Sequence, residues 1–400
     1  MRVVVLGAAG EMGRVASRVL SQNDEITDLI LVDRDPNGVA GTALSIRPDA
    51  RNNVSSLVCD VLVKHELHSI LDNADLVLNC SGPFFRVGLP SLVAAIETRT
   101  TYIDICDDPD PTIQMFELHN EAKEAGVEAI IGMGASPGVS NLLALRASTY
   151  LDEVHDCFTG WSLDDSSNGE DKAALEQPDG NPTGALIHFM EQIHGSVAVV
   201  KDGELVRRPP LEAISLDYPS LGSGTGYVVG HPEPVTLHKS LKVKGQSCNL
   251  VLVSDGGTAA YLRGLQKGLD DGKLDLVDAA KLLLKPSAMR IASAAITGTV
   301  MQGSGSLPPL FALLRGVKDG RQVSVGCHVT TLPRGMAGAT SIPAALAAIQ
   351  VLTRGPIPGV HAPESVIDGN ELFTKLIPFC TNQVQSVSDL APVVVSVTQR

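Results

Sequence analysis

The chain lacks an excess of basic residues. Its 400 residues include 31 Lys and Arg against 45 Asp and Glu, which gives a formal net charge of −14. Nucleic acids and anionic membranes bind clustered Lys and Arg, so the composition argues against both kinds of partner. No apolar run approaches the roughly 20 residues that cross a bilayer, and the apolar start is too short for a signal peptide. We expect a cytoplasmic protein that acts on a small molecule.

The signatures of a disulfide framework or a metal site are also absent. The seven cysteines are odd in number, widely scattered and include no Cys-x-x-Cys pair. His65 and His68 are three residues apart, whereas the two histidines of a zincin helix are four apart. His188 and His194, which are six apart, offer no stronger pair. We therefore predict no metal in the functional site. A chain that is 44% hydrophobic and 19% charged is typical of a globular enzyme.

A glycine-rich turn near the start is the most informative feature of the chain. The apolar strand at residues 3–6 ends in three glycines spaced every third residue, and a helical pattern follows directly. Such glycines let the backbone approach a pyrophosphate, while the first amides and the dipole of the helix favour its charge. The predicted phosphate-binding residues are Gly7, Gly10, Glu11, Met12 and Gly13.

A carboxylate follows at the position expected for a dinucleotide site. The apolar strand at residues 29–32 ends in Asp33, 20 residues after Gly13. There it would accept hydrogen bonds from the adenine ribose and repel a 2′-phosphate, whereas Arg34 could turn toward such a phosphate. We predict NAD or NADP as cofactor, with NAD preferred. The alternative is an ordinary tight turn with a capping carboxylate.

The order of the expected elements indicates the fold. Strand and helix patterns alternate to about residue 135, with strands near 57–59, 75–80, 101–104 and 127–131 and helices near 64–71, 89–97 and 112–125. This alternation predicts a Rossmann-type, doubly wound α/β fold whose parallel sheet carries helices on both faces.

The pattern changes after Gly132, where we expect an α+β catalytic domain. Residues 164–184 resemble a long loop, residues 222–226 a glycine-rich turn, and helices are expected near 274–284 and 342–352, with a strand near 323–325. We predict a dinucleotide-binding domain over 1–134, a substrate domain over 135–338, and a segment over 339–400.

Ligands of such sheets lie beyond the carboxyl ends of the strands, so three further segments matter. The first segment begins with Ser81, Gly82 and Pro83, which we predict to contact the cofactor. Two aromatic residues that could pack against a nicotinamide follow them, and then Arg86. The second, at residues 104–108, is acidic, and its last two aspartates precede Pro109, which is typical of a helix start with a cap. The third runs from 132 to 138.

The third segment contains an alternative function. Residues 134–138 match the Gly-x-Ser-x-Gly turn of serine hydrolases, with Ser136 as the nucleophile. Such an elbow uses the amide after the serine in its oxyanion hole, and Pro137 has no N–H. We favour a turn that starts a helix over 139–147, with Ser136 near its N-cap.

Several of these segments together resemble the saccharopine dehydrogenase-like oxidoreductases, which include saccharopine reductases and lysine dehydrogenases. The similar segments are 80–84, 102–104, 132–138 with Asn141, 230–236 and 359–364. The resemblance implies a Rossmann domain with an inserted, mixed-sheet catalytic and dimerisation domain, a C-terminal return, a homodimer, and hydride transfer between NAD(P) and an amine-bearing carbon. Saccharopine reductases tend to have an acidic residue where this chain has Ala135 and Ser136, which favours the lysine-dehydrogenase side or a separate branch of the family.

Hydride loss from a C–N carbon needs a deprotonated amine, and therefore a nearby base. His231 and Glu233 are the candidates: they stand two apart in a proline-bracketed, extended segment, which would place both on one face. The alternative is a rigid turn with a solvated histidine. Arg86 would hold a substrate carboxylate, or be solvated, and Asp104 would hold an ammonium group. A dinucleotide-binding protein without turnover is the remaining alternative to an enzyme.

Overall fold

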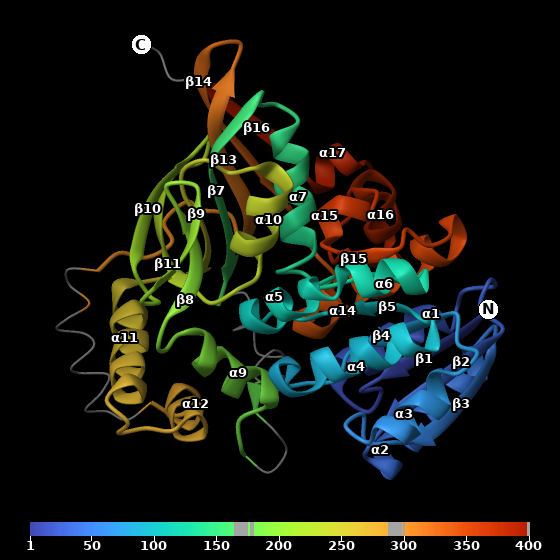
Figure 1. Ribbon diagram of the computed structural model, residues 1–400. Helices are drawn as coiled ribbons and strands as arrows, with labels where there is room; N and C mark the ends of the chain where they lie inside the picture. Colours follow the sequence, from blue (N-terminus) through green and yellow to red (C-terminus); the bar gives the residue numbers. More distant parts are fainter. Residues whose placement is uncertain (164–174, 177–179, 287–297, 299–300, 398–400) are drawn as a thin grey trace. The chain divides into compact units, whose positions relative to one another are not determined.

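The computed structural model describes residues 1–163, 175–176, 180–286, 298 and 301–397, which form two compact units (Figure 1). Unit 1 contains Met1–Leu142 and Thr331–Leu390, and unit 2 contains Leu143–Thr330 and Ala391–Arg400. The return to unit 1 thus begins at Thr331, before the expected residue 339, and the described residues from Ala391 onward belong to unit 2. Most of the expected loop at 164–184 lies outside the described residues.

Unit 1 is built on a sheet of seven parallel strands, which confirms the Rossmann-type prediction. In spatial order these are β15 (Gly359–His361), β6 (Glu128–Ile130), β5 (Thr101–Asp104), β4 (Leu76–Asn79), β1 (Arg2–Leu6), β2 (Asp28–Asp33) and β3 (Asn53–Val58). Because β1 lies between β2 and β4, the strand order reverses there. This is the point at which doubly wound sheets bind their ligands.

The helices of unit 1 differ from expectation mainly at their starts. They are α1 (Glu11–Leu20), α2 (Pro36–Ile46), α3 (Lys64–Leu71), α4 (Phe84–Thr98), α5 (Pro109–Glu117), α6 (His119–Ala125), α14 (Gly335–Arg354), α15 (Pro363–Val366), α16 (Gly369–Leu376) and α17 (Val387–Leu390). α4 starts five residues early and contains Pro90, which sequence patterns treat as a breaker. The single helix expected over 112–125 is two helices that meet at Leu118.

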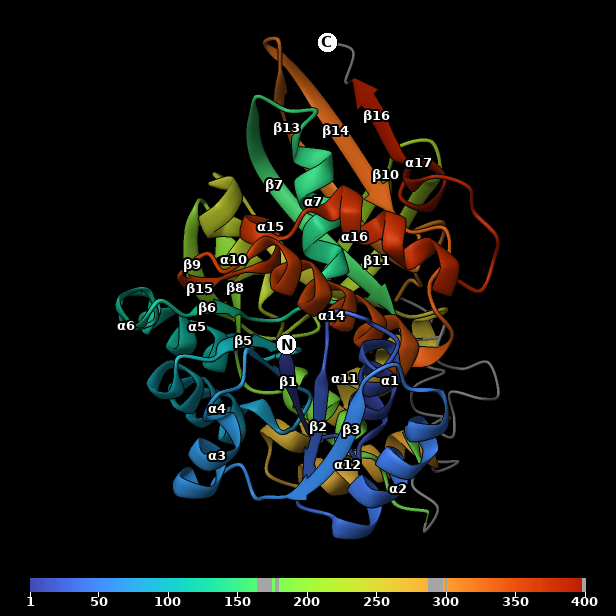
Figure 2. The same ribbon diagram turned by 90° about the vertical axis from the view of Figure 1, so that its right-hand side faces the viewer.

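α14 is a core helix that packs along α1 (Figure 2). It is long and apolar enough to cross a membrane by length and composition, which corrects the expectation that no apolar run approaches that length. However, 61% of its most apolar stretch is buried, and its Ser341 hydroxyl donates to the sulfur of Met12 on α1. Its apolar surface is therefore largely used within unit 1.

Unit 2 is built on a mixed sheet, as the resemblance implied. Its main order is β10 (Ala213–Tyr218), β11 (Gly222–Val229), β12 (Ser247–Leu252), β7 (Glu153–Ser162), β13 (Leu310–Lys318), β14 (Arg321–His328) and β16 (Val393–Val397), with β8 (Val197–Lys201) and β9 (Glu204–Arg208) at its side. Of the pairs between these strands, β12–β7 is parallel and the others are antiparallel. The predicted turn at 222–226 is wrong, because these residues are paired within β11.

The described helices of unit 2 are α9 (Gly184–Gln192), α10 (Glu233–Leu241), α11 (Gly256–Asp270) and α12 (Leu276–Leu284), and α7 (Val139–Ser148) leads into it from unit 1. α7 and α12 agree closely with the helices expected near 139–147 and 274–284. Because β16 pairs with β14, the end of the chain completes the sheet of unit 2.

A buried ion pair fastens the returning segment of unit 1. Glu128 on β6 is fully buried, and both of its carboxylate oxygens contact the guanidinium of Arg354 at the end of α14. The amide of Ile357 also donates to Glu128, over 2.9 Å. Such two-pronged contacts fix geometry as well as charge. They hold the link between α14 and β15 against β6.

Replacing Arg354 with leucine should destabilise unit 1, because it leaves a buried carboxylate without its cation. Removing one partner of a buried ion pair typically costs about 3–5 kcal/mol, measurable by urea denaturation. The matched control is Arg51→Leu. Arg51 pairs with Asp24 where the side chains are 57% and 76% exposed, and such pairs contribute only about 0–1 kcal/mol. Equal losses in the two variants would contradict the proposed role of the buried pair.

Candidate functional site

The glycines after β1 allow three pieces of backbone to meet closely. Gly7 has a positive φ of +75°, and a Cβ there would lie 2.7 Å from the backbone of Cys80 and Ser81. A Cβ on Gly13 would meet the carbonyl oxygen of Gly7 and lie 2.7 Å from the Cα of Ala8. The first turn of α1 and the loop after β4 can therefore both press against the loop after β1.

This arrangement leaves the start of α1 suited to an anion. Gly10 occupies the N-cap in an extended conformation and has no side chain with which to cap the helix. The amides of the first turn, at Glu11, Met12 and Gly13, are the ones that a helix cannot satisfy internally. Together with the helix dipole, they suit a pyrophosphate.

Asp33 joins two of the loops at this edge. At the end of β2, its Oδ2 accepts from the Ala9 amide over 2.9 Å and its Oδ1 accepts from the Asp35 amide over 3.0 Å. Asp33 therefore caps the amides of a tight turn, as the alternative interpretation predicted. Each carboxylate oxygen has a second lone pair, so Asp33, which is partly exposed, can still accept from a ribose. Arg34 beside it is exposed.

A chain of hydrogen bonds runs from the loop after β4 into the sheet. The Asn79 side-chain oxygen accepts from the amide and hydroxyl of Ser81, and its amide group donates to the Tyr102 hydroxyl over 3.0 Å. That hydroxyl donates to Asp104 over 2.9 Å. The position of Ser81, one of the predicted cofactor residues, thus depends on buried side chains of β4 and β5.

Asp104 connects this chain to two further loops. It is fully buried, and its Oδ1 accepts from the amides of Cys106, over 3.1 Å, and Gly132, over 2.8 Å. Burial raises the pKa of Asp104 to about 7, although these hydrogen bonds oppose the shift. Its predicted contact with a substrate ammonium group stays a prediction. The contacts described give it a different task, which is to fasten the loops after β4, β5 and β6.

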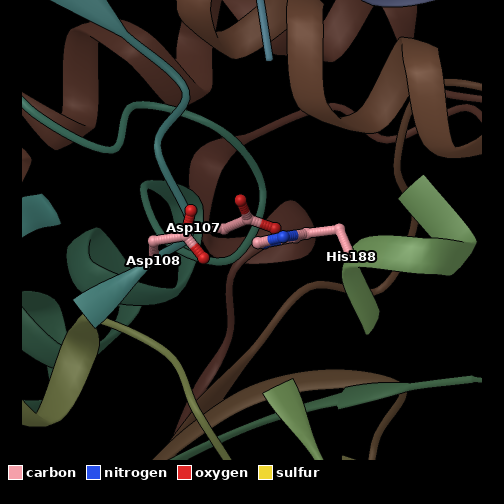
Figure 3. Close-up of side chains that lie close together, drawn as sticks. All are labelled: Asp107, Asp108 and His188. Atoms are coloured by element: carbon pink, nitrogen blue, oxygen red, sulfur yellow. The ribbon is translucent and has the colours of Figure 1, made fainter. Parts of the chain in front are cut away.

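The remaining polar residues at this edge are placed as follows. Arg86, predicted to hold a carboxylate, is exposed in the first turn of α4 rather than in a loop. Asp107 and Asp108 lie between β5 and α5 in the chain. Figure 3 draws their side chains and that of His188. Asp108 occupies the N-cap of α5 as predicted, but its side chain makes no capping hydrogen bond.

The turn at Ser136 is fastened by structural contacts. The Gly138 amide donates to the side-chain oxygen of Asn141 over 2.9 Å, and the Asn141 amide group donates to Glu364 of α15 over 2.9 Å. The Gly134 amide donates to the carbonyl of Pro137. Because Pro137 has no N–H, the donor that a hydrolase elbow places after its serine is missing.

In unit 2, His231 and Glu233 do meet, although not in the predicted way. The segment is not extended: Pro232 is the N-cap of α10 and Glu233 is its first residue. Prolines are common at helix starts, so the proline bracket signalled a helix rather than a strand. His231 Nδ1 lies 3.3 Å from Glu233 Oε2, and the side chains are 4% and 1% exposed. The dipole of α10 favours a carboxylate at its first turn.

The neighbours of this pair were missed by the sequence analysis. The Trp161 ring lies 5.7 Å from the His231 ring, and the Asn249 amide group donates to Glu233 over 2.9 Å. Trp161 and Asn249 come from β7 and β12, which are far apart in sequence. Only the parallel pairing of these strands, in which Asn249 lies opposite Thr159, brings them together.

Comparison with known proteins identifies the first domain. Residues 3–130 match the family described as the saccharopine dehydrogenase NADP binding domain. The predicted resemblance is confirmed. That description supports NAD(P) as the ligand of residues 3–130. The residues fit this group, because the close approach of backbone at Gly7 and Gly13 leaves the first amides of α1 for a pyrophosphate.

Individual proteins agree with this assignment. The chain is 21% identical to carboxyaminopropylagmatine dehydrogenase of Synechocystis, over 88% of this chain and 89% of that protein. It is 22% identical to carboxynorspermidine synthase of Vibrio cholerae, over 61% of each chain. The fold resembles that of saccharopine dehydrogenase (L-Glu forming) from Saccharomyces cerevisiae, with a TM-score of 0.57, 14% identity and full coverage of both chains.

Replacing Gly13 with alanine should weaken NADH binding by at least about tenfold, since the new methyl group separates α1 from the loop that receives the pyrophosphate. Isothermal titration calorimetry measures the affinity. Gly41→Ala is the control, because Gly41 lies inside α2 with nothing within 4 Å of the added Cβ. It should leave binding unchanged and stabilise the helix by about 1 kcal/mol. Unchanged affinity in Gly13→Ala would argue against this phosphate site.

The stability of unit 1 should depend on pH through Asp104. Its pKa is about 7 when folded and near 3.8 in an unfolded chain. The folded protein therefore binds more protons between these values, and the free energy of unfolding falls as pH rises through them, by up to about 1.4 kcal/mol per unit. Asp104→Asn should remove this contribution. Urea denaturation at pH 5 and pH 8 tests it: the same pH dependence in both proteins would be evidence against a buried, titrating Asp104.

Proposed function

We propose that this NAD(P)-dependent oxidoreductase acts on the C–N bond of a carboxylated amine, or on the corresponding imine. The names of two relatives, carboxyaminopropylagmatine dehydrogenase and carboxynorspermidine synthase, both describe carboxylated amines, which supports this substrate class. In the chain itself, the proposal is carried by one observation. The buried His231–Glu233 pair in unit 2 supplies a base held beside a carboxylate.

The pair suits the proton transfer that such a reaction needs. Oxidation of an amine removes a hydride from carbon and a proton from nitrogen, and the bound NAD(P) supplies the hydride chemistry. His231 takes the proton from the substrate nitrogen at Nε2, because Nδ1 faces Glu233. The carboxylate then stabilises the imidazolium. In the direction of reduction, the same imidazolium returns the proton to nitrogen.

Further residues have proposed roles in recognition. Arg86 is exposed and has the planar group that binds carboxylates with two hydrogen bonds, so we assign it to the substrate carboxylate. Asp33 favours NAD over NADP, since its charge would repel a 2′-phosphate. The homodimer and the cytoplasmic location stay predictions from the sequence.

The reaction is tested by a screen of amino acids, and of 2-oxo acids paired with amines, that follows NADH and NADPH absorbance at neutral and alkaline pH. We expect turnover with a carboxylated secondary amine or its precursors, and a lower KM for NADH than for NADPH. Tight NADH binding without turnover of any pair would favour the non-catalytic alternative.

With a substrate in hand, His231→Asn should lower kcat by about 10²–10⁴-fold, the usual contribution of a general base. The matched control is His194→Asn in the same unit. His194 also lies beside a carboxylate, with its Nδ1 3.5 Å from Asp270, but both side chains are 39% exposed. The control should keep full activity. If His231→Asn kept it too, His231 would not be the base.

A further inference from the structure

The indole of Trp161 fixes the orientation of a buried amide. Its Nε1–H donates to the side-chain oxygen of Asn249 over 3.0 Å. An indole nitrogen can only donate, so the oxygen of Asn249, and not its NH₂ group, must face Trp161. The two ends of an amide side chain are otherwise easily exchanged. Here the NH₂ group is forced to the opposite side.

On that side, the NH₂ group has two acceptors. One is Oε1 of Glu233, at 2.9 Å, and the other is the hydroxyl oxygen of Thr159, also at 2.9 Å. Asn249 and Glu233 have no exposed surface, and Thr159 is 1% exposed. With Oε1 held by Asn249, the second oxygen of the carboxylate is the one that faces His231, 3.3 Å from Nδ1.

We infer that Asn249 is a positioning residue, which holds the Glu233 carboxylate against His231 and thereby keeps the imidazole ready to hold a proton. The inference rests on the proposed role of His231 as the base. It adds a residue that touches neither substrate nor cofactor in that proposal and acts only through Glu233. Trp161 in turn sets the orientation of Asn249.

Glu233 is a charged side chain beside this imidazole. α10 packs against β7, β8 and β12. β7 and β12 present Thr159, Trp161 and Asn249, which are uncharged. Val197 of β8 lies against Gly230, just before the histidine.

α9 adjoins the same segment, because the Gly230 amide donates to the carbonyl of Gln192. The ionisable side chains of α9 are His188 and Glu191, which lie 3.8 Å from each other. A titration experiment must therefore separate His231 from His188, and the variant His231→Asn does so.

The single tryptophan of the chain provides the reporter. A protonated imidazole in contact with an indole quenches its fluorescence, and Trp161 lies against His231. Fluorescence of the full chain measured against pH should therefore show a transition that His231→Asn abolishes. This readout needs neither substrate nor turnover, so it tests the positioning role even if the proposed reaction is wrong.

In Glu233→Gln the midpoint of this transition should move to lower pH, since the imidazolium loses its carboxylate. Asn249→Leu should shift the midpoint in the same direction, because Glu233 is no longer held. Once a substrate is known, the pH profile of kcat in these variants should shift in the same direction as the fluorescence midpoint. Asn249→Ser keeps a polar group on the buried strand but is too short to reach Glu233, and it provides the measurement if the leucine variant does not fold.

The control variant is Glu153→Gln. Glu153 and His155 form a similar pair, with 2.7 Å between Oε1 and Nε2, and both side chains are 38% exposed. They lie on the same strand as Trp161, with His155 roughly 20 Å from it along the strand. The control should leave the midpoint unchanged. If Glu233→Gln shifts the midpoint and both Asn249 variants leave it in place, the positioning role of Asn249 is wrong. If the midpoints shift as expected but His231→Asn is fully active, the positioning stands and the proposed function fails.

Discussion

The architecture of the dinucleotide site depends on how closely backbone can approach backbone at Gly7. Its positive φ and missing side chain let the loop after β1 lie against the backbone of Cys80 and Ser81. The reversal of strand order at β1 makes β2 and β4 its two neighbours, so their loops must share the space at its end. Any side chain at Gly7 would separate them. The anion site at the start of α1 depends on this close approach, which places the loop after β1 directly before the first amides of the helix.

Both units bury polar groups, and each does so by giving them partners from several strands. In unit 1, the carboxylate of Asp104 accepts hydrogen bonds from Tyr102, Cys106 and Gly132. In unit 2, Asn249 accepts a hydrogen bond from Trp161 and donates to Thr159 and to Oε1 of Glu233. A buried polar group without partners is costly, so such networks specify one arrangement of the loops and strands that carry them. This specificity is what a site needs when its residues come from distant parts of a chain.

The sequence predicts the features that depend on local chemistry. The glycine spacing, the strand before it and Asp33 after the next strand are local signals, and the structure assembles them at one edge of the sheet. The helix start at Pro109 was predicted for the same reason. Tyr102 and Asp104 carry a weaker signal, since residues two apart on a strand share a face.

What could not be predicted depends on the register between distant strands. Asn249 lies opposite Thr159 only because β12 pairs with β7 in one register. No local pattern marks either residue as a partner of Glu233. The segment at His231 was misjudged for a different reason. Its prolines fit both an extended bracket and a helix start, and the choice is settled by how α10 packs against β7, β8 and β12.

The two buried carboxylates differ in a way that fits different tasks. Asp104 lies at the end of β5, where three hydrogen bonds do not offset burial, and its pKa is accordingly raised to about 7. It can lose its charge and still connect loops, because a protonated carboxyl group also forms hydrogen bonds. Glu233 begins a helix, receives a hydrogen bond from Asn249 and lies beside an imidazole. A carboxylate in that position can stabilise an imidazolium, whereas Asp104 is surrounded by the loops that it connects, which is why we place the chemistry at Glu233 and the structural role at Asp104.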